Sequence, residues 1–415
     1  MSNIAGVEAF RAAEWVRSFR PSAINEMLRL TARPGVVSLA LGLPAPDLFP
    51  AEVLADCAAR AITDDPRALQ YGHPQPRVRA QIAEMMRQRG VECRPEQVVM
   101  TSGAQQALSI LARVFLEPGG QVMAERLTYN GLACVLEPLR PELLLVPTSR
   151  EHGIDVEAVE DALAAGAAPA FLYVVPEGHN PLGVSLREES RARLVQTARR
   201  YGVPIVEDDA YGFLHYGGAP LPALRALDDR WVFYVGSFSK ILAPASRVGW
   251  IVAPEEMVPA LLAAKDACDL DMNTLGQRVV SAFLAGSHLD AHLARLRAEY
   301  RARRDLMDTC LRLHFPAEAR WRIPASGLFF WVELPPEVDC AALLARAVET
   351  ERVAFVPGHA YAADGSRYGS HCMRLNFSFS PPEEIEKGVA ALGRALRAHL
   401  NGEAPPPAEP NGSGS

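Results

Sequence analysis

The stretch Trp231-Val232-Phe233-Tyr234-Val235-Gly236-Ser237-Phe238-Ser239-Lys240 begins with five apolar residues and ends in small and hydroxylated residues and a lysine. A short continuous apolar run of this kind predicts a buried strand. Similar runs at 170–175 and 204–208 alternate with helical patterns at 104–115 and 187–201. Apolar strands that alternate with helices predict an α/β fold with a mostly parallel sheet covered on both faces. Ligands of such sheets bind at the carboxyl ends of the strands, which is where Lys240 is expected.

The pattern changes after about residue 280. A long Arg-rich amphipathic stretch at 289–315 predicts one helix, and shorter strand and helix patterns follow it. These predict a smaller α+β domain, and the Pro-, Gly- and Ser-rich end predicts disorder. We therefore expect an N-terminal arm belonging to the small domain at 1–45, a large domain at 46–285, a small C-terminal domain at 286–400 and a disordered tail at 401–415.

Composition excludes several classes of protein. The 415 residues carry a formal net charge of −7, which disfavours a nucleic-acid partner. The seven cysteines are scattered singly without a C-x-x-C motif, so we expect neither a disulfide framework nor a metal site. The sequence has no apolar signal core and no run of eighteen apolar residues. We expect a soluble, cytoplasmic protein without a membrane partner.

The chain has only three lysines, and they lie in different contexts. Lys265 and Lys387 occur in helical patterns and are expected on solvated helix faces. Lys240 follows a buried strand, where desolvation suits an amine that forms and exchanges imines. A single lysine after a strand is more often structural or a surface residue. The functional interpretation of Lys240 therefore depends on the residues near it.

An anion site is predicted near Lys240. Arg247, together with the hydroxyls of Ser237 and Ser239, could bind a phosphate group. The segment Ser102-Gly103-Ala104-Gln105 joins a strand to a helix N-terminus, where backbone N–H groups and the helix dipole favour an anion. Strand-Ser-Gly-helix is a common sequence, so this signal is weak by itself.

Asp208 and Tyr211 come directly after another predicted strand. A carboxylate there could be a metal ligand, an acid/base group, a partner for a protonated ring nitrogen, or simply an acid in a turn. A metal would require a second group of ligands, and only Glu207 and Asp209 are adjacent. These alternatives stay open on the residues alone.

Taken together, these residues resemble the fold-type-I enzymes that use pyridoxal 5′-phosphate (PLP), specifically the class I/II aminotransferase superfamily. The closest likeness is to the 2-aminoadipate-type branch, which shares its domain with regulators of the MocR type. The resemblance extends over about residues 18–400. Its motifs occur in order as Leu48-Phe49-Pro50, Leu69-Gln70-Tyr71-Gly72, Ser102-Gly103-Ala104-Gln105, Tyr129, Asn180-Pro181-Leu182-Gly183, Asp208 to Tyr211, Ser237 to Lys240, Arg247 and Arg374-Leu375-Asn376-Phe377.

The resemblance implies a seven-stranded, mostly parallel sheet and a role for each motif. Lys240 would form a Schiff base with PLP and transfer protons once the substrate displaces it. Asp208 would pair with the pyridine nitrogen, Tyr211 and Asn180 would bind the phenolic oxygen, and Tyr129 would stack on the ring.

The remaining motifs imply contacts with phosphate, substrate and a second subunit. Residues 102–105, namely Ser102, Gly103, Ala104 and Gln105, would hold the phosphate with Ser237, Ser239 and Arg247. Tyr71 would reach the phosphate of the partner subunit, so a homodimer is expected. Arg374 would bind the α-carboxylate of an amino acid substrate through a two-pronged hydrogen bond, with Gly42 and Asn180 beside it.

The sequence also departs from the family pattern near these motifs. His179-Asn180-Pro181-Leu182-Gly183 replaces Gln-Asn-Pro-Thr-Gly, and Pro176-Glu177-Gly178 replaces Pro-Asn-aromatic. Leu41-Gly42-Leu43-Pro44 and Pro244-Ala245-Ser246-Arg247 differ as well. We expect these changes to reshape the substrate pocket. His179 is either an added acid/base group or a structural hydrogen-bonding residue, and Arg20 either binds a distal substrate carboxylate or forms a surface salt bridge.

Three functions are compatible with this pattern. The first is an aminotransferase that exchanges an amino group between an α-amino acid and a 2-oxo acid. The second uses the same scaffold for elimination, replacement, carbon–carbon bond formation, with S-adenosylmethionine as one candidate substrate, or oxidative decarboxylation. The third is a PLP-sensing regulator, which is disfavoured because only about twenty residues precede the domain and the charge is acidic.

Overall fold

A computed structural model describes residues 11–18, 34–72 and 76–403. Its centre is a seven-stranded sheet in the order β2-β10-β9-β8-β7-β3-β4. All strands are parallel except β10, which is antiparallel to both neighbours. This confirms the fold expected from the sequence. The strands are β2 (Val98–Thr101), β3 (Gln121–Glu125), β4 (Glu142–Val146), β7 (Phe171–Val174), β8 (Ile205–Asp208), β9 (Val232–Ser237) and β10 (Gly249–Val252).

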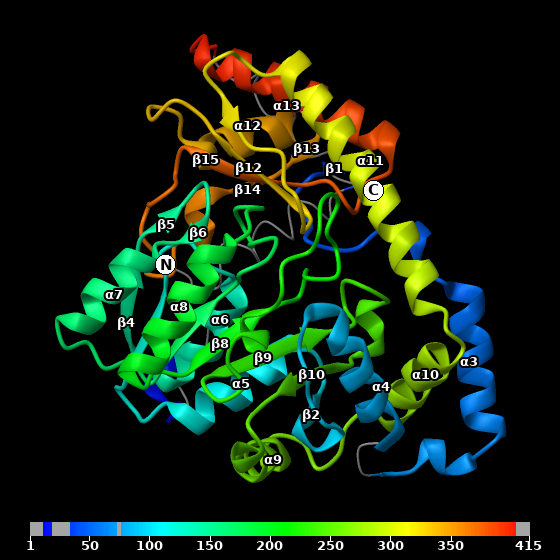
Figure 1. Ribbon diagram of the computed structural model, residues 1–415. Coiled ribbons are helices and arrows are strands. Elements are labelled where there is room, and N and C mark those ends of the chain that lie inside the picture. Colours follow the sequence, from blue (N-terminus) through cyan, green and yellow to red (C-terminus); the bar gives the residue numbers. More distant parts are fainter. Residues whose placement is uncertain (1–10, 19–33, 73–75, 404–415) are drawn as a thin grey trace.

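Helices cover both faces of this sheet, as the apolar strands require (Figure 1). One face packs on α5 (Ala104–Phe115), α6 (Asn130–Leu136) and α9 (Val258–Asp266). The opposite face packs partly on α7 (Val156–Ala164) and α8 (Glu188–Tyr201). On this opposite face, the part formed by β2 and β10 is covered by three other helices, α3 (Ala51–Thr63), α4 (Pro76–Met86) and α10 (Thr274–Ala285).

A second, four-stranded antiparallel sheet has the order β11-β12-β15-β14. In Figure 1 the long helix α11 (Leu289–His314) runs from beside α10 up to this sheet, where it packs on the final helix, α13 (Pro382–Leu400). The elements of this part are β11 (Arg320–Trp321), β12 (Phe329–Glu333), α12 (Cys340–Glu351), β13 (Val353–Ala354), β14 (Val356–Pro357), β15 (Cys372–Asn376) and α13 (Pro382–Leu400). Four further short elements are α1 (Glu14–Ser18), β1 (Val37–Ser38), β5 (Thr148–Ser149) and β6 (Gly153–Ile154).

The predicted domain boundaries stay a proposal, which three observations support. β1 pairs with β13, which joins the predicted arm to the small part. α10 ends at Ala285 and α11 begins at Leu289, on either side of the predicted boundary. The final helix ends at Leu400, where the tail was predicted to begin, and residues 404–415 lie outside the described part.

The topology brings the predicted site residues to one edge of the large sheet. The carboxyl ends of β2 and β9 meet the start of β10 there, because Gly249 pairs with both Thr101 and Ser237. Arg247, just before β10, therefore lies beside the two strand ends that carry the serines. Across residues 11–18, 34–72 and 76–403, no helix has the length and apolar character that crossing a membrane requires.

Candidate active site

A cavity of about 470 Å³ lies at the carboxyl edge of the large sheet. Residues from both sheets and from the segment at 40–43 line it, so the small part of the chain closes the site that the large sheet opens. Most of the residues singled out in the sequence meet here. They are Gly42, Ala104, Gln105, Tyr129, Asn180, Asp208, Tyr211, Ser237, Ser239, Lys240, Arg247 and Arg374.

Lys240 follows β9, and its Nζ donates a 2.8 Å hydrogen bond to the carbonyl oxygen of Gly42. Burial lowers the pKa of Lys240 to about 8, and the positive charge of Arg374 acts in the same direction. A substantial fraction of the amine is then neutral near physiological pH. A neutral amine is the form that can attack a carbonyl carbon.

Asp208 ends β8 and is buried. Its Oδ2 accepts a 2.8 Å hydrogen bond from the Tyr173 hydroxyl. Its Oδ1 is buried and has no hydrogen-bond partner within the described part of the chain. Burial raises the pKa of Asp208 to about 6. A buried carboxylate oxygen without a donor is costly, so this atom fits a ligand that brings a donor of its own.

The opposite end of the cavity is built to hold an anion. Gly103 precedes α5 with φ +100°, and an added Cβ would lie 3.0 Å from the Arg247 guanidinium. Ser237 Oγ donates to Ser239 Oγ at 2.9 Å and accepts from the Ser239 backbone N–H at 3.1 Å. The first N–H groups of α5, the two hydroxyls and the guanidinium thus gather where a phosphate would bind.

Arg374 on β15 forms the third part of the cavity. Its guanidinium donates to Asn180 Oδ1 at 2.9 Å and to the Ala40 carbonyl oxygen. It also lies over the ring of Phe329, 4.1 Å from the centroid, and over the ring of Tyr361 at 4.9 Å. These contacts fix the orientation of the planar Arg374 guanidinium group. A guanidinium group can bind a carboxylate through two parallel hydrogen bonds.

Comparison with known proteins decides the family. The family model "Aminotransferase class I and II" matches residues 35–392. The chain belongs to the class I and II aminotransferases. Two curated relatives are a 2-aminoadipate transaminase of Thermus thermophilus, 40% identical over 91% of this chain and 94% of the relative, and aromatic-amino-acid aminotransferase 1 of Thermococcus litoralis, 35% identical over 94% of each.

A solved structure agrees with this assignment. LysN, an α-aminoadipate aminotransferase from Thermus thermophilus, superimposes with a TM-score of 0.87 and 38% identity over 95% of this chain and 98% of that one. It was crystallised with N-(5′-phosphopyridoxyl)-L-leucine. The protein is therefore a PLP-dependent aminotransferase that acts on amino acids, and the expected likeness to the 2-aminoadipate-type branch is confirmed.

The residues present fit this cofactor. The unpartnered Asp208 Oδ1 suits a protonated ring nitrogen, and the group around Gly103 and Arg247 suits a phosphate. Lys240 lies in the same cavity. Tyr129 also lines it, and burial raises the pKa of this phenol to about 12. The two ends of the cavity thus offer complementary groups to the two polar ends of PLP.

Some predicted site residues of the aminotransferase lie outside the cavity lining. Ser102 lines a neighbouring surface depression with Arg247, and Gly103 lies directly beneath that guanidinium. Tyr71 is 76% exposed and contributes nothing to this cavity. Arg20 lies outside the described residues. The role proposed for Tyr71 requires a second subunit.

The departures around Asn180 are structural, contrary to the expectation that they shape the substrate pocket. His179 is fully buried and does not line the cavity. Its Nε2 lies 3.0 Å from Glu125 Oε2, and its Nδ1 accepts from the Leu182 backbone N–H at 3.4 Å. The structural alternative for His179 is thus the one the geometry favours. Of the departures in the other two segments, Leu41 lines the cavity, whereas Ala245 and Ser246 do not.

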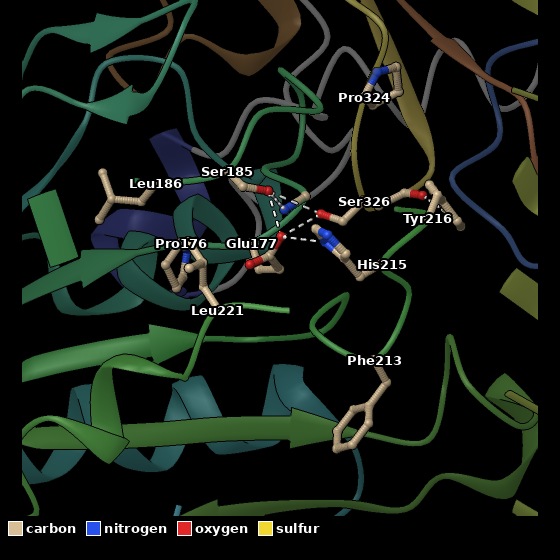
Figure 2. A network of polar contacts seen from close by, with 12 residues as sticks. Pro176, Glu177, Ser185, Leu186, Phe213, His215, Tyr216, Leu221, Pro324 and Ser326 are labelled. Atoms are coloured by element: carbon tan, nitrogen blue, oxygen red, sulfur yellow. Dashed lines mark hydrogen bonds and ion pairs between the residues drawn. The ribbon is translucent and has the colours of Figure 1, made fainter. Parts of the chain in front are cut away.

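Glu177 precedes Asn180 by three residues and lies at the centre of a network of polar contacts (Figure 2). Its Oε1 accepts from Ser185 Oγ at 2.6 Å and from Ser326 Oγ at 2.7 Å, with His215 Nδ1 3.7 Å away. Its Oε2 accepts from Arg191 at 2.6 Å. Ser326 precedes β12, so this buried network links the large sheet to the small one. We call these five residues the Glu177 network.

Some residues around the site carried no sequence signal. Tyr173 and Tyr361 occur in apolar patterns, and nothing in them indicates that one binds Asp208 and the other lies against Arg374. The expectation for Lys265 was wrong, because this lysine is 3% exposed and pairs with Asp269 at 2.9 Å. Asp269 lies four residues after Lys265, just beyond the end of α9, and this spacing is visible in the sequence.

Proposed function

We propose that this aminotransferase prefers amino acids with apolar or aromatic side chains. The observation that supports this is the character of the cavity wall. Ala40, Leu41, Leu43, Val356 and Tyr361 line it. Among the described lining residues, the charged side chains are Asp208, Lys240, Arg247 and Arg374, and each of these has a role toward the cofactor or the α-carboxylate.

The proposed roles follow the geometry of the site. PLP, when bound, takes up the electron pair left behind as a substrate loses its α-proton. Lys240 would hold the cofactor covalently, and its amine would move the α-proton of the substrate. Asp208 Oδ1 would accept a hydrogen bond from the ring N–H, and Arg374 would bind the substrate α-carboxylate. Because Asn180 Oδ1 already accepts from Arg374, its amide N–H remains free to donate to the phenolic oxygen, together with Tyr211.

The other cofactor contacts are part of the same proposal. The first turn of α5, the serine hydroxyls and the exposed guanidinium would hold the phosphate, and an aromatic ring would stack on the pyridine face. The residues in these roles are Ser102, Gly103, Ala104, Gln105, Ser237, Ser239, Arg247 and Tyr129. One relative agrees with an apolar substrate, since it is an aromatic-amino-acid aminotransferase. LysN is named for the acidic α-aminoadipate, although it was crystallised with a leucine adduct.

The substrate preference is tested by single-turnover conversion of the enzyme-bound pyridoxal to the pyridoxamine form. We expect leucine and phenylalanine to react roughly 10- to 100-fold more efficiently than glutamate and 2-aminoadipate, because the apolar wall leaves a second carboxylate unpaired. A faster reaction with the acidic substrates would contradict the proposal. Leu43 lines the cavity, so Leu43→Lys should reduce the preference for apolar over acidic amino acids. Leu227 is exposed and outside the cavity, so the control Leu227→Lys should leave this preference unchanged.

We also propose that the working unit is a homodimer. Leu69, Tyr71 and Leu270 are 67%, 76% and 85% exposed. The segments that carry them are joined by a 2.6 Å hydrogen bond from the Gly72 N–H to Asp271 Oδ2. A cluster of large exposed apolar side chains is typical of an interface. A second copy covering it agrees with the role that the family resemblance implies for Tyr71, which is to reach the partner's phosphate site.

Sedimentation of Leu270→Asp tests the dimer. An unpaired carboxylate in the interface should weaken dimerisation roughly 30-fold or more and release PLP along with it. Leu313→Asp is the control, because Leu313 is 74% exposed on α11, near the second sheet. A monomeric parent enzyme, or equal behaviour of the two variants, would overturn this arrangement.

A cytoplasmic location completes the proposal. All seven cysteines are free, including the exposed Cys134 and Cys268. Unpaired exposed thiols are typical of proteins in a reducing compartment.

A further inference from the structure

Tyr173 lies behind the cofactor-facing carboxylate and does not line the cavity. It belongs to β7, which pairs in parallel with β8, the strand that ends in Asp208. The side chain of Tyr173 is fully buried, and its hydroxyl lies 2.8 Å from Asp208 Oδ2. Burial and the neighbouring negative charge of Asp208 raise the pKa of Tyr173 well above its ordinary value. The phenol therefore keeps its proton and is the donor.

This bond treats the two oxygens of Asp208 differently. Oδ2 is occupied by the phenol, whereas Oδ1 is buried and lacks a partner among the residues described. A carboxylate held by one oxygen cannot rotate freely about its last side-chain bond. The bond also favours the charged form of the acid, against the burial that disfavours it.

The surroundings of Asp208 show that few other groups support its charge. Burial raises its pKa, and the negative charge of Asp209 acts in the same direction. The Tyr173 hydroxyl, the Ala210 backbone N–H and the positive charge of Lys240 lower it. The phenols of Tyr129 and Tyr211 also face this carboxylate, and Glu125 faces the Tyr173 ring. Tyr173 is the largest of the stabilising influences.

We propose that Tyr173 is a positioning residue of this aminotransferase, which keeps Asp208 ionised and turns its free oxygen toward the ring nitrogen of PLP. The proposal rests on the role assigned above to Asp208. Tyr173 acts through that carboxylate and touches neither cofactor nor substrate.

The chain supplies a matched control on a nearby strand. Tyr234 on β9 is also fully buried, and its hydroxyl donates to Asp209 Oδ2 at 3.0 Å. Asp209 binds Arg89 at 2.9 Å and does not line the cavity. Tyr234→Phe thus removes the same atom from the same kind of bond, on a carboxylate that faces away from the cofactor.

The test measures PLP binding to the full-length apoenzyme between pH 5 and 8, by quenching of tryptophan fluorescence. Affinity should be high where Asp208 is ionised and should fall as pH drops through its pKa. Removing the Tyr173 hydroxyl raises that pKa, so in Tyr173→Phe the midpoint should move up by about one pH unit. Near pH 6 the dissociation constant should be several-fold larger than in the parent enzyme.

Tyr234→Phe should leave both the midpoint and the affinity for PLP unchanged. It should lower the unfolding temperature by about as much as Tyr173→Phe does. An unshifted midpoint in Tyr173→Phe, or an equal shift in Tyr234→Phe, overturns the proposal. Asp208→Asn separates this failure from failure of the proposed function. If Asp208→Asn binds PLP as the parent does, the role of Asp208 is wrong. If Asp208→Asn binds PLP more weakly than the parent but Tyr173→Phe shows no shift of the midpoint, the positioning role of Tyr173 is wrong.

Discussion

Replacing Lys240 with alanine should abolish the adduct that borohydride traps and lower kcat by at least about 10²–10⁴-fold. The lower bound is the contribution of a positioned acid/base group, and loss of the covalent link to the cofactor adds to it. Within the described residues the cavity offers no substitute amine, because the other two lysines lie elsewhere: Lys265 is paired with Asp269, and Lys387 is exposed on α13.

Lys387→Ala is the control for this experiment. Both variants are reduced with borohydride in the presence of PLP, digested and analysed by mass spectrometry. The parent enzyme and Lys387→Ala should carry the adduct on the peptide that contains Lys240. An adduct on any other peptide, or normal turnover by Lys240→Ala, would contradict the assignment. Addition of a small primary amine should restore part of the proton transfer in Lys240→Ala, since the shortened side chain leaves room for it.

Replacing Glu177 with alanine should destabilise the protein by about 3–5 kcal/mol. The Glu177 and Arg191 side chains are 2% and 0% exposed, and removing one partner of a buried pair leaves the other charge uncompensated. Ser185 and Ser326 lose their acceptor as well. The measurement is urea-induced unfolding of the apoenzyme at pH 7. A matched exposed pair, Glu151 with Arg322, supplies the control, because Glu151→Ala should cost no more than about 1 kcal/mol.

The pH dependence of this effect has a definite sign. Burial alone would raise the pKa of Glu177, but His215, Arg191 and Ser185 together lower it to about 2. A depressed carboxyl pKa contributes stability that is fully present above the unfolded value near 4.5 and is lost as pH falls toward 2. The difference in unfolding free energy between the parent and Glu177→Gln should therefore be constant from pH 5 to 7 and shrink below about pH 4.5. A difference that does not change with pH would mean that the charge of Glu177 contributes nothing.

The Glu177 network also explains why an altered motif is compatible with the family's reaction. Glu177 and His179 bind groups behind the turn, and Asn180 alone reaches the cavity from this segment. The side chains that differ from the family pattern here support the turn from within. The altered side chains do not displace Asn180 from the cavity, which agrees with the aminotransferase assignment.

Local patterns in the sequence determined the large sheet and most of its site. Buried parallel strands are continuous apolar runs, and their carboxyl ends meet at one edge, so Asp208, Ser237 and Lys240 could be placed together from the sequence. The glycine before α5 and the arginine before β10 follow from the same rule. These features depend on residues that are neighbours in the chain.

Only the tertiary structure decided which distant groups form hydrogen bonds with the site residues. Gly42 lies 198 residues from the lysine whose hydrogen bond it accepts, and Tyr173 lies 35 residues from the carboxylate it holds. An apolar strand pattern does not distinguish a tyrosine that only packs from one whose hydroxyl has a partner. Likewise, no pattern separates a histidine that lines a cavity from one buried behind it. The reason is physical: periodicity along the chain specifies which residues are buried, whereas packing between layers specifies which buried polar atoms meet.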